Sequence, residues 1–482
     1  MLATETVTQT AIQRPAVLPA PGPKPGAART RLLLEGPIVS TLLRLGAPNV
    51  VVNVVLIAVT TTIDAYFVGQ LGSSALAGLA LTFPLIMLMQ QMANSSMGGA
   101  IASAVARALG AGRRDDAAAL VVHALVIACG MAAAFTAVVL TAGPMFYRLM
   151  GGSGAALDAA AEYSTAIFAG ALGYWILSAL TSVIRGAGQA AVLAGVYLVA
   201  EVLHVMLVPM LVFGVGPIPP LGVAGAGIAT VTSFTCSTLA LAWYVASGRT
   251  PITFALRNVR FERRLFAEIV RVGAPAALTP ILGNVTLAVL TGFVGTLGPT
   301  ALAGFGAAVR LEYVQVPLTF GLGAGVLAMV GTNIGAGRIA RAARIAWTAV
   351  AVAVSATASI GLLAFARPDI WIGLFSADPG VHTAGARYLQ IMSVTYPFLG
   401  LGFMLSYAFN AAGRPLWPLI AIVTRVVIVA AGGWTVVHFT SSSLRAFALV
   451  GAGGLLVYGS ILAIAFRAGA WLPNVRQGGG QT

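Results

Sequence analysis

The sequence LGAPNVVVNVVLIAVTTTIDAYFVGQLGSSALAG, residues 45–78, and the sequence GGAIASAVARALGAGR, residues 98–113, decide the fold of this chain. They describe two long apolar helices joined at Leu71 and Gly72, with one acid, Asp64, inside the first. A carboxylate within a membrane helix costs roughly 2.5–3.5 kcal/mol on insertion scales, so it indicates a functional site. The same pattern returns near residue 271 without the acid.

The composition of the chain defines its class. Of 482 residues, 59% are hydrophobic and 8% are charged, with a mean hydropathy of +0.94. Soluble proteins carry about 25% charged residues, so this is a polytopic membrane protein. The net charge of +14 comes mainly from arginines at the ends of apolar runs. Positive-inside topology and anionic lipid headgroups account for it, and no nucleic-acid partner is expected.

The cysteines and histidines predict no disulfide, metal site or bound cofactor. Cys129 and Cys236 lie in apolar spans without paired spacing, and the four histidines form no ligand motif. Lys24 is the only lysine, so the chain has no nucleotide-binding P-loop, and protease and hydrolase motifs are absent as well. The protein is therefore not expected to be an enzyme, and any transport must be driven by a gradient.

Apolar runs long enough to cross a bilayer divide the chain into twelve predicted helices. They cover residues 45–69, 75–106, 117–142, 158–184, 190–213, 222–247, 268–297, 301–331, 342–366, 383–411, 416–437 and 444–467. We expect an N-lobe over 41–247, a cytoplasmic linker over 248–267 and a C-lobe over 268–467. Residues 1–40 read as a disordered cytoplasmic tail and 468–482 as a second tail. Arginines concentrate in the loops that this layout places inside, which puts both termini in the cytoplasm and the protein in the cytoplasmic membrane.

An internal repeat relates the two predicted lobes. LRLGAP at 43–48 returns as VRVGAP at 270–275, LGSSALAG at 71–78 as LGPTALAG at 297–304, and GAGR at 110–113 as GAGR at 335–338. Tyr163 likewise matches Tyr388. Each half holds six helices and so enters and leaves on the same side. The sequence therefore predicts an all-α fold of two six-helix lobes, related by a pseudo-two-fold axis along the membrane normal with a cavity between them.

These doubled motifs resemble those of the MATE (multidrug and toxic compound extrusion) transporters, in particular the bacterial DinF-like branch. The resemblance covers about residues 40–467 and includes RGAGQ at 185–189 and GVAGAGIAT at 222–230. It implies a twelve-helix antiporter that exports organic compounds, often lipophilic or cationic, against an inward flow of protons or sodium. We expect a functional monomer whose partners are small organic substrates and the lipid bilayer.

Asp64 is the first candidate for coupling transport to a cation. The equivalent position in the second repeat holds Leu290 or Thr291, so only the N-lobe has an acid at this position. An apolar setting penalises the charged carboxylate, which lets the acid take up a proton on one side and release it on the other. In the resemblance, Asp64 matches the helix-one aspartate that is linked to cation coupling. The competing interpretation is a structural acid with no transport role.

Glu201 and His204 form a second candidate group, because three residues apart on one helix they share a face. Histidine titrates near neutral pH, so both side chains could join Asp64 in a proton relay. The family pattern of an Asn followed four residues later by an Asp falls here at His204 and Val208, so the expected Asp is missing. A buried hydrogen-bonded pair that stabilises the helix is the alternative.

The C-lobe carries one intramembrane acid and two arginines. Glu312, Arg310 and Arg425 predict a buried ion pair, since pairing reduces the cost of charges in the membrane. This group reads as a structural clamp or as a substrate contact. No acid lies in residues 271–297 or 383–411, so a C-lobe sodium site of the kind found elsewhere in the family is not expected.

Polar side chains inside predicted spans are candidates for the wall of a substrate cavity, where water or ligands can satisfy them. The candidates are Asn53, Thr61, Gln90, Gln91, Asn94, Asn284, Glu312 and Tyr396. Two other functions remain alternatives: a flippase for a lipid-linked or polyisoprenoid substrate, and a membrane scaffold or receptor that transports nothing. A flippase for a pyrophosphate headgroup would need a cationic cavity.

Overall fold

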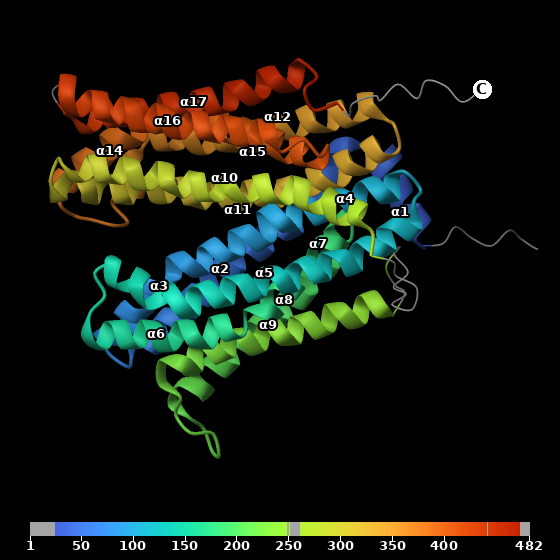
Figure 1. The fold of residues 1–482 in the computed structure, drawn as a ribbon. Helices are drawn as coiled ribbons and strands as arrows, with labels where there is room; N and C mark the ends of the chain where they lie inside the picture. The colour runs from blue at the N-terminus through green and yellow to red at the C-terminus, as the bar shows by residue number, and fades with distance from the viewer. Residues whose placement is uncertain (1–24, 248–249, 251–260, 441, 473–482) are drawn as a thin grey trace, which may run out of the picture.

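The computed structural model describes residues 25–247, 250, 261–440 and 442–472; of residues 25–29, 52–59, 61, 190 and 191 it gives the backbone only. Every regular element in these ranges is helical (Figure 1). In chain order the elements are α1 (Pro25–Glu35), α2 (Ile38–Gly69), α3 (Ser73–Gln91), the π-helix η1 (Met92–Met97), α4 (Gly98–Gly110), α5 (Arg114–Leu149), α6 (Gly154–Ala169), α7 (Ala171–Gly186), α8 (Ala190–Phe213), α9 (Gly222–Ala246), α10 (Arg263–Gly295), α11 (Pro299–Gly335), α12 (Ile339–Ala366), α13 (Pro368–Ile372), α14 (Pro379–Ser393), α15 (Tyr396–Ala411), α16 (Leu416–Phe439) and α17 (Leu444–Arg467).

These helices confirm the twelve predicted spans. Nine continuous helices of the described chain are long and apolar enough to cross a membrane, with α3, η1 and α4 together forming one of them. Two further spans are helix pairs bent at a short break, α6 with α7 by 48° and α14 with α15 by 52°. The twelfth span is α2, whose 32 residues include the stretch described by backbone alone. The two bends fall in repeat-related spans, so they belong to the duplicated design.

The helices form two lobes, α2–α9 and α10–α17, which are the lower and upper layers in Figure 1. One buried core is built mainly on α10–α17 and also takes in Leu42 and Leu45 of α2, and another is built mainly on α3–α9 and also takes in Ile269 of α10. The GAGR motif ends a helix in the same way in both lobes. Gly112 and Gly337 each have a φ of 73°, and the following amides of Arg113 and Arg338 donate to carbonyls five residues earlier. Only glycine adopts this left-handed conformation without strain, which explains the repeated motif.

The lobes touch where α2 and α4 cross α11 and where η1 meets α10, and the α4–α11 crossing is on the side of the molecule where α1 lies (Figure 1). A Cβ atom added to Gly110 would lie 2.0 Å from the carbonyl oxygen of Thr332. A Cβ atom added to its repeat-mate Gly335 would lie 2.1 Å from the carbonyl oxygen of Arg107. The crossing is thus nearly symmetric, and the backbones approach so closely because both positions lack a side chain.

The prediction of a disordered tail up to residue 40 is wrong for its last part. Residues 25–35 form α1, and α2 already begins at Ile38. The Leu33 side chain is 3% exposed and lies near Gly188 of the N-lobe, while its carbonyl accepts from Asn333 Nδ2 of the C-lobe at 3.0 Å. Composition alone missed this helix because its anchors are a single leucine and backbone carbonyls. Residues 1–24 and 473–482 lie outside the described chain.

Candidate functional site: an acid cluster and a charged cavity

The N-lobe brings Asp64 together with two partners from other helices. His204 Nε2 on α8 lies 3.0 Å from Asp64 Oδ1, and the Tyr163 hydroxyl on α6 donates to Asp64 Oδ2 over 3.2 Å. Asp64 is 4% exposed and His204 is 2% exposed. The proposed partnership of Asp64 with His204 is therefore present as direct contact. Both carboxylate oxygens have a partner, which reduces the cost of placing this acid inside the lobe.

The Asp64–His204 pair can hold one exchangeable proton. With that proton the pair is electrically neutral, either as acid with imidazole or as carboxylate with imidazolium. Without it, a carboxylate faces a neutral imidazole and the pair carries one negative charge. The hydrogen bond persists in both states if Nε2 keeps its hydrogen, because the other ring nitrogen can lose its own. The hydrogen bond between Asp64 and His204 is therefore compatible with either charge of the pair.

Glu201 lies beside this pair and does not touch it directly. Both of its carboxylate oxygens lie near the Thr60 hydroxyl of α2, at 3.0 and 3.1 Å. It is close enough to Asp64 and His204 to interact with their charges. The three predicted coupling residues therefore form one buried group between α2 and α8, with Asp64 and His204 at its centre.

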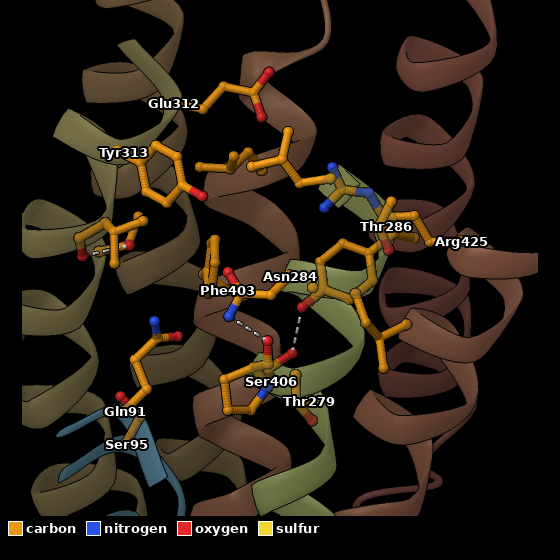
Figure 2. A pocket seen from close by; sticks show the side chains of 18 of the residues that line it. Gln91, Ser95, Thr279, Asn284, Thr286, Glu312, Tyr313, Phe403, Ser406 and Arg425 are labelled. Atoms are coloured by element: carbon orange, nitrogen blue, oxygen red, sulfur yellow. Dashed lines mark hydrogen bonds between the residues drawn. The ribbon is translucent and has the colours of Figure 1, made fainter. Parts of the chain in front are cut away.

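A cavity of about 240 Å³ lies mainly in the C-lobe (Figure 2). Its walls come from α10, α11, α14, α15, α16 and α17, and Gln91 of α3 with Ser95 and Ser96 of η1 closes it from the N-lobe. Ser96 also donates to the Ala276 carbonyl of α10 over 3.0 Å, which ties the π-helix to the other lobe. π-Helical turns frequently mark functional sites.

The predicted C-lobe ion pair does not form as expected. The Arg310 guanidinium is exposed and lies over the Phe375 ring, 4.8 Å from its centroid, so it has no part in the cavity. Glu312 and Arg425 both line the cavity, but the ion pairs of the described residues include neither of them. The two helices hold these charges on different walls, and spacing along the sequence could not reveal that.

The polar candidates separate into cavity residues and structural residues. Gln91 and Asn284 line the cavity. Asn94 instead bonds Tyr174 and Ser178 of α7 within the N-lobe. Tyr396 is fully buried in the C-lobe core and does not line the cavity. Gln90 is half-buried and does not line the cavity. The side chains of Asn53 and Thr61 lie outside the described residues.

Several site residues were missed in the sequence. Tyr163 was noted only as the repeat-mate of Tyr388, although it donates to Asp64. Tyr388 itself lines the C-lobe cavity, together with Ser406 and Tyr458, whose hydroxyls lie 2.9 Å apart. The repeated tyrosine was the available signal, because a polar group kept in both halves of an apolar duplication suggests a shared position near the centre of each lobe.

Two duplicated six-helix lobes with titratable and charged groups buried inside them are the architecture of a membrane transporter. The chain belongs to the MatE family, whose model matches residues 50–210 and again residues 275–435. The two matches fall on the two lobes, as the internal repeat requires. The transporters of this family are not enzymes, in agreement with the absence of catalytic motifs.

Curated relatives cover most of the chain at modest identity. A FAD transporter from Shewanella oneidensis is 26% identical over 407 residues, which are 82% of this chain and 87% of the relative. The multidrug export protein MepA of Staphylococcus saprophyticus is 27% identical over 76% of this chain and 80% of its own. The probable multidrug resistance protein NorM of Deinococcus radiodurans is 27% identical over 92% of this chain and 99% of its own.

Solved structures share the fold. A MATE crystal structure in the bent conformation superposes with a TM-score of 0.84 at 24% identity and covers 92% of this chain and 98% of its own. A MOP superfamily transporter from Pyrococcus furiosus gives a TM-score of 0.83 at 23% identity over the same shares of the two chains. At these identities the likeness establishes the twelve-helix, two-lobed architecture.

Proposed function

We propose that this transporter exports organic compounds across the cytoplasmic membrane in exchange for an inward-moving cation, which is a proton carried at Asp64. The observation that carries this proposal is the buried hydrogen-bonded pair of Asp64 and His204. It is a reversible proton site inside a lobe, and the C-lobe cavity supplies a separate place for a compound. The names of the MepA and NorM relatives support export of small organic molecules.

Coupling requires that the charge of the acid cluster depend on which side the cavity faces. The protonated Asp64–His204 pair is neutral and can move between lobe arrangements at low electrostatic cost. The deprotonated pair carries a charge and favours the arrangement that gives it water or a cation. Each proton that crosses 100 mV supplies about 2.3 kcal/mol, which sustains roughly a forty-fold substrate gradient.

A flippase function for a pyrophosphate-linked lipid has less support from the cavity. Such a headgroup needs several cationic side chains around it. Among the described residues that line the cavity, one arginine, Arg425, is matched by one acid, Glu312. The walls of the cavity therefore carry no excess of positive charge.

Transport by purified protein in proteoliposomes tests the proposal. We expect ethidium transport to follow an imposed pH gradient and to require no sodium. Asp64→Asn should abolish gradient-driven transport, because the pair then cannot carry its negative charge. Asp158→Asn, an exposed acid on α6, is the matched control and should transport normally. Undiminished pH-driven transport by Asp64→Asn would refute the coupling role, and transport driven by sodium alone would reassign the ion.

A further inference from the structure

The C-lobe cavity contains two opposite charges that interact electrostatically but form no ion pair with each other. Glu312 reaches it from α11 and Arg425 from α16, and Figure 2 shows the two side chains coming from different walls. Glu312 Oε1 and Arg425 Nε are buried without a hydrogen-bond partner. Leaving both groups incompletely partnered inside a membrane lobe is costly, so the arrangement favours a ligand that supplies the missing partners.

The position of Arg425 depends on its neighbours. Its stem packs against Gly454 of α17, where an added Cβ would lie 3.3 Å from Arg425 Cγ. The missing side chain at Gly454 leaves room for the arginine stem next to α17. The nearest candidate for neutralising Glu312 within its own helix, Arg310, lies over Phe375. Glu312 and Arg425 are therefore close enough to interact electrostatically, while among the described residues neither is paired with a neighbouring charge at ion-pair distance.

Aromatic rings form much of the wall of the same cavity. Tyr313, Phe320, Tyr388, Phe403, Tyr407 and Tyr458 all line it. Such walls bind a flat apolar body, and the phenol hydroxyls add hydrogen-bonding groups. A volume of about 240 Å³ suits a small molecule with one aromatic ring system.

We propose that this cavity is a substrate site for amphoteric aromatic compounds, with an anionic group on Arg425 and an ammonium group on Glu312. The inference rests on the proposed export function and specifies its substrate class. A guanidinium binds a carboxylate through two parallel hydrogen bonds, while a carboxylate accepts from an ammonium. A compound with either charge alone leaves the other protein charge without its partner.

Three ligands with one aromatic body test this proposal on purified protein in detergent. They are 4-(2-aminoethyl)benzoate, which is a zwitterion, its methyl ester, which is a cation, and 4-ethylbenzoate, which is an anion. Binding is measured by calorimetry without any ion gradient. We expect the zwitterion to bind about tenfold more tightly than either analogue, which corresponds to one charge-assisted contact. Equal binding of all three ligands by the unmodified protein would overturn the proposal.

Variants assign each charge to its partner. Arg425→Gln should bind the zwitterion no better than its ester, and Glu312→Gln should bind it no better than 4-ethylbenzoate. Arg310→Gln is the matched control outside the cavity and should keep the full preference. If Arg425→Gln does not fold, Arg425→Lys should keep the preference in weakened form, because it retains the charge without the planar fork. The assignment would be contradicted if Arg425→Gln or Glu312→Gln folds and binds all three ligands with the affinities of the unmodified protein.

The outcome is separable from that of the export proposal. Asp64→Asn should lose gradient-driven transport and still prefer the zwitterion in the binding assay, because Asp64 does not line the cavity. If the unmodified protein transports normally but binds the three ligands equally, only the proposed substrate class is refuted. Intact preference without any gradient-driven transport refutes the export mechanism alone.

Discussion

The close crossing of α4 and α11 predicts that one methyl group will shift the equilibrium between the conformations of the transporter. In Gly110→Ala the new Cβ would start 2.0 Å from the Thr332 carbonyl oxygen. An ordinary contact is about 3.4 Å, so the helices must separate by about 1.4 Å or distort. Backbone cannot swing aside like a flexible side chain, and overpacking of this kind costs about 1–3 kcal/mol.

That cost falls on the arrangement in which the two lobes touch at this crossing. A conformation in which the lobes are separated at this crossing does not contain the clash. Its population relative to the conformation described here should therefore rise by about five-fold to 150-fold. Spin labels at Asp115 on α5 and Arg344 on α12, both exposed, report the separation of the lobes on this side. The native cysteines Cys129 and Cys236 are exposed and are replaced first.

We expect Gly110→Ala to add or enlarge a population with a longer distance between the labels in double electron–electron resonance. Gly130→Ala on α5 is the matched control, because a Cβ there meets nothing within 4 Å. It should leave the distance distribution unchanged. An unaltered distribution in Gly110→Ala, in protein that is folded and labelled, would falsify the view that this crossing closes one side of the transporter.

Two further changes test other contacts between the lobes. Arg107→Gln removes the inter-lobe bonds from Arg107 to Glu268 Oε1 at 3.1 Å and to a backbone carbonyl of α15 at 2.9 Å, and should favour the same longer distances by about 1–3 kcal/mol. The exposed Arg148, changed to Gln, should have no such effect. Leu33→Ala should loosen α1 by about 2–5 kcal/mol and speed trypsin cleavage at Arg31, whereas unchanged cleavage would show that Leu33 is not the anchor.

Most of the architecture could be predicted because the membrane leaves few choices. Backbone groups must be satisfied within each span, so an apolar run of sufficient length is a helix. Matched motifs such as GAGR then fixed the number of lobes and their symmetry. The bent pairs and α1 could not be predicted in this way. A span interrupted at Gly170 reads as one apolar run, and α1 is held by contacts whose partners lie about 300 residues away in the sequence.

The candidate site could be predicted only at residue types that are rare inside membrane spans. Asp64 and Glu201 stand out because acids are expensive inside membrane spans, and the structure brings them into one group with His204. The prediction that Arg310 belongs to a buried ion-pair group with Glu312 and Arg425 was wrong, because side chains two residues apart on a helix point to different faces. Which wall of a cavity holds Arg425 depends on how α16 packs against α17, and a linear pattern does not contain that information.

The duplication also explains how the two lobes acquired different chemistry on one scaffold. Tyr163 and its repeat-mate Tyr388 are both buried. Tyr163 donates to Asp64. In the C-lobe, Tyr388 and Leu290, one of the two candidate repeat positions of the acid, lie close to Gly451. The C-lobe thus has space where the N-lobe has a carboxylate with two partners. A proton site in one lobe and a compound site in the other can exchange energy through the contacts between the lobes, which include the bond from Ser96 to Ala276 beside the cavity and the crossings of α2 and α4 with α11. The glycine crossing of α4 and α11, whose glycines do not line the cavity, should therefore contribute to the coupling of the two sites.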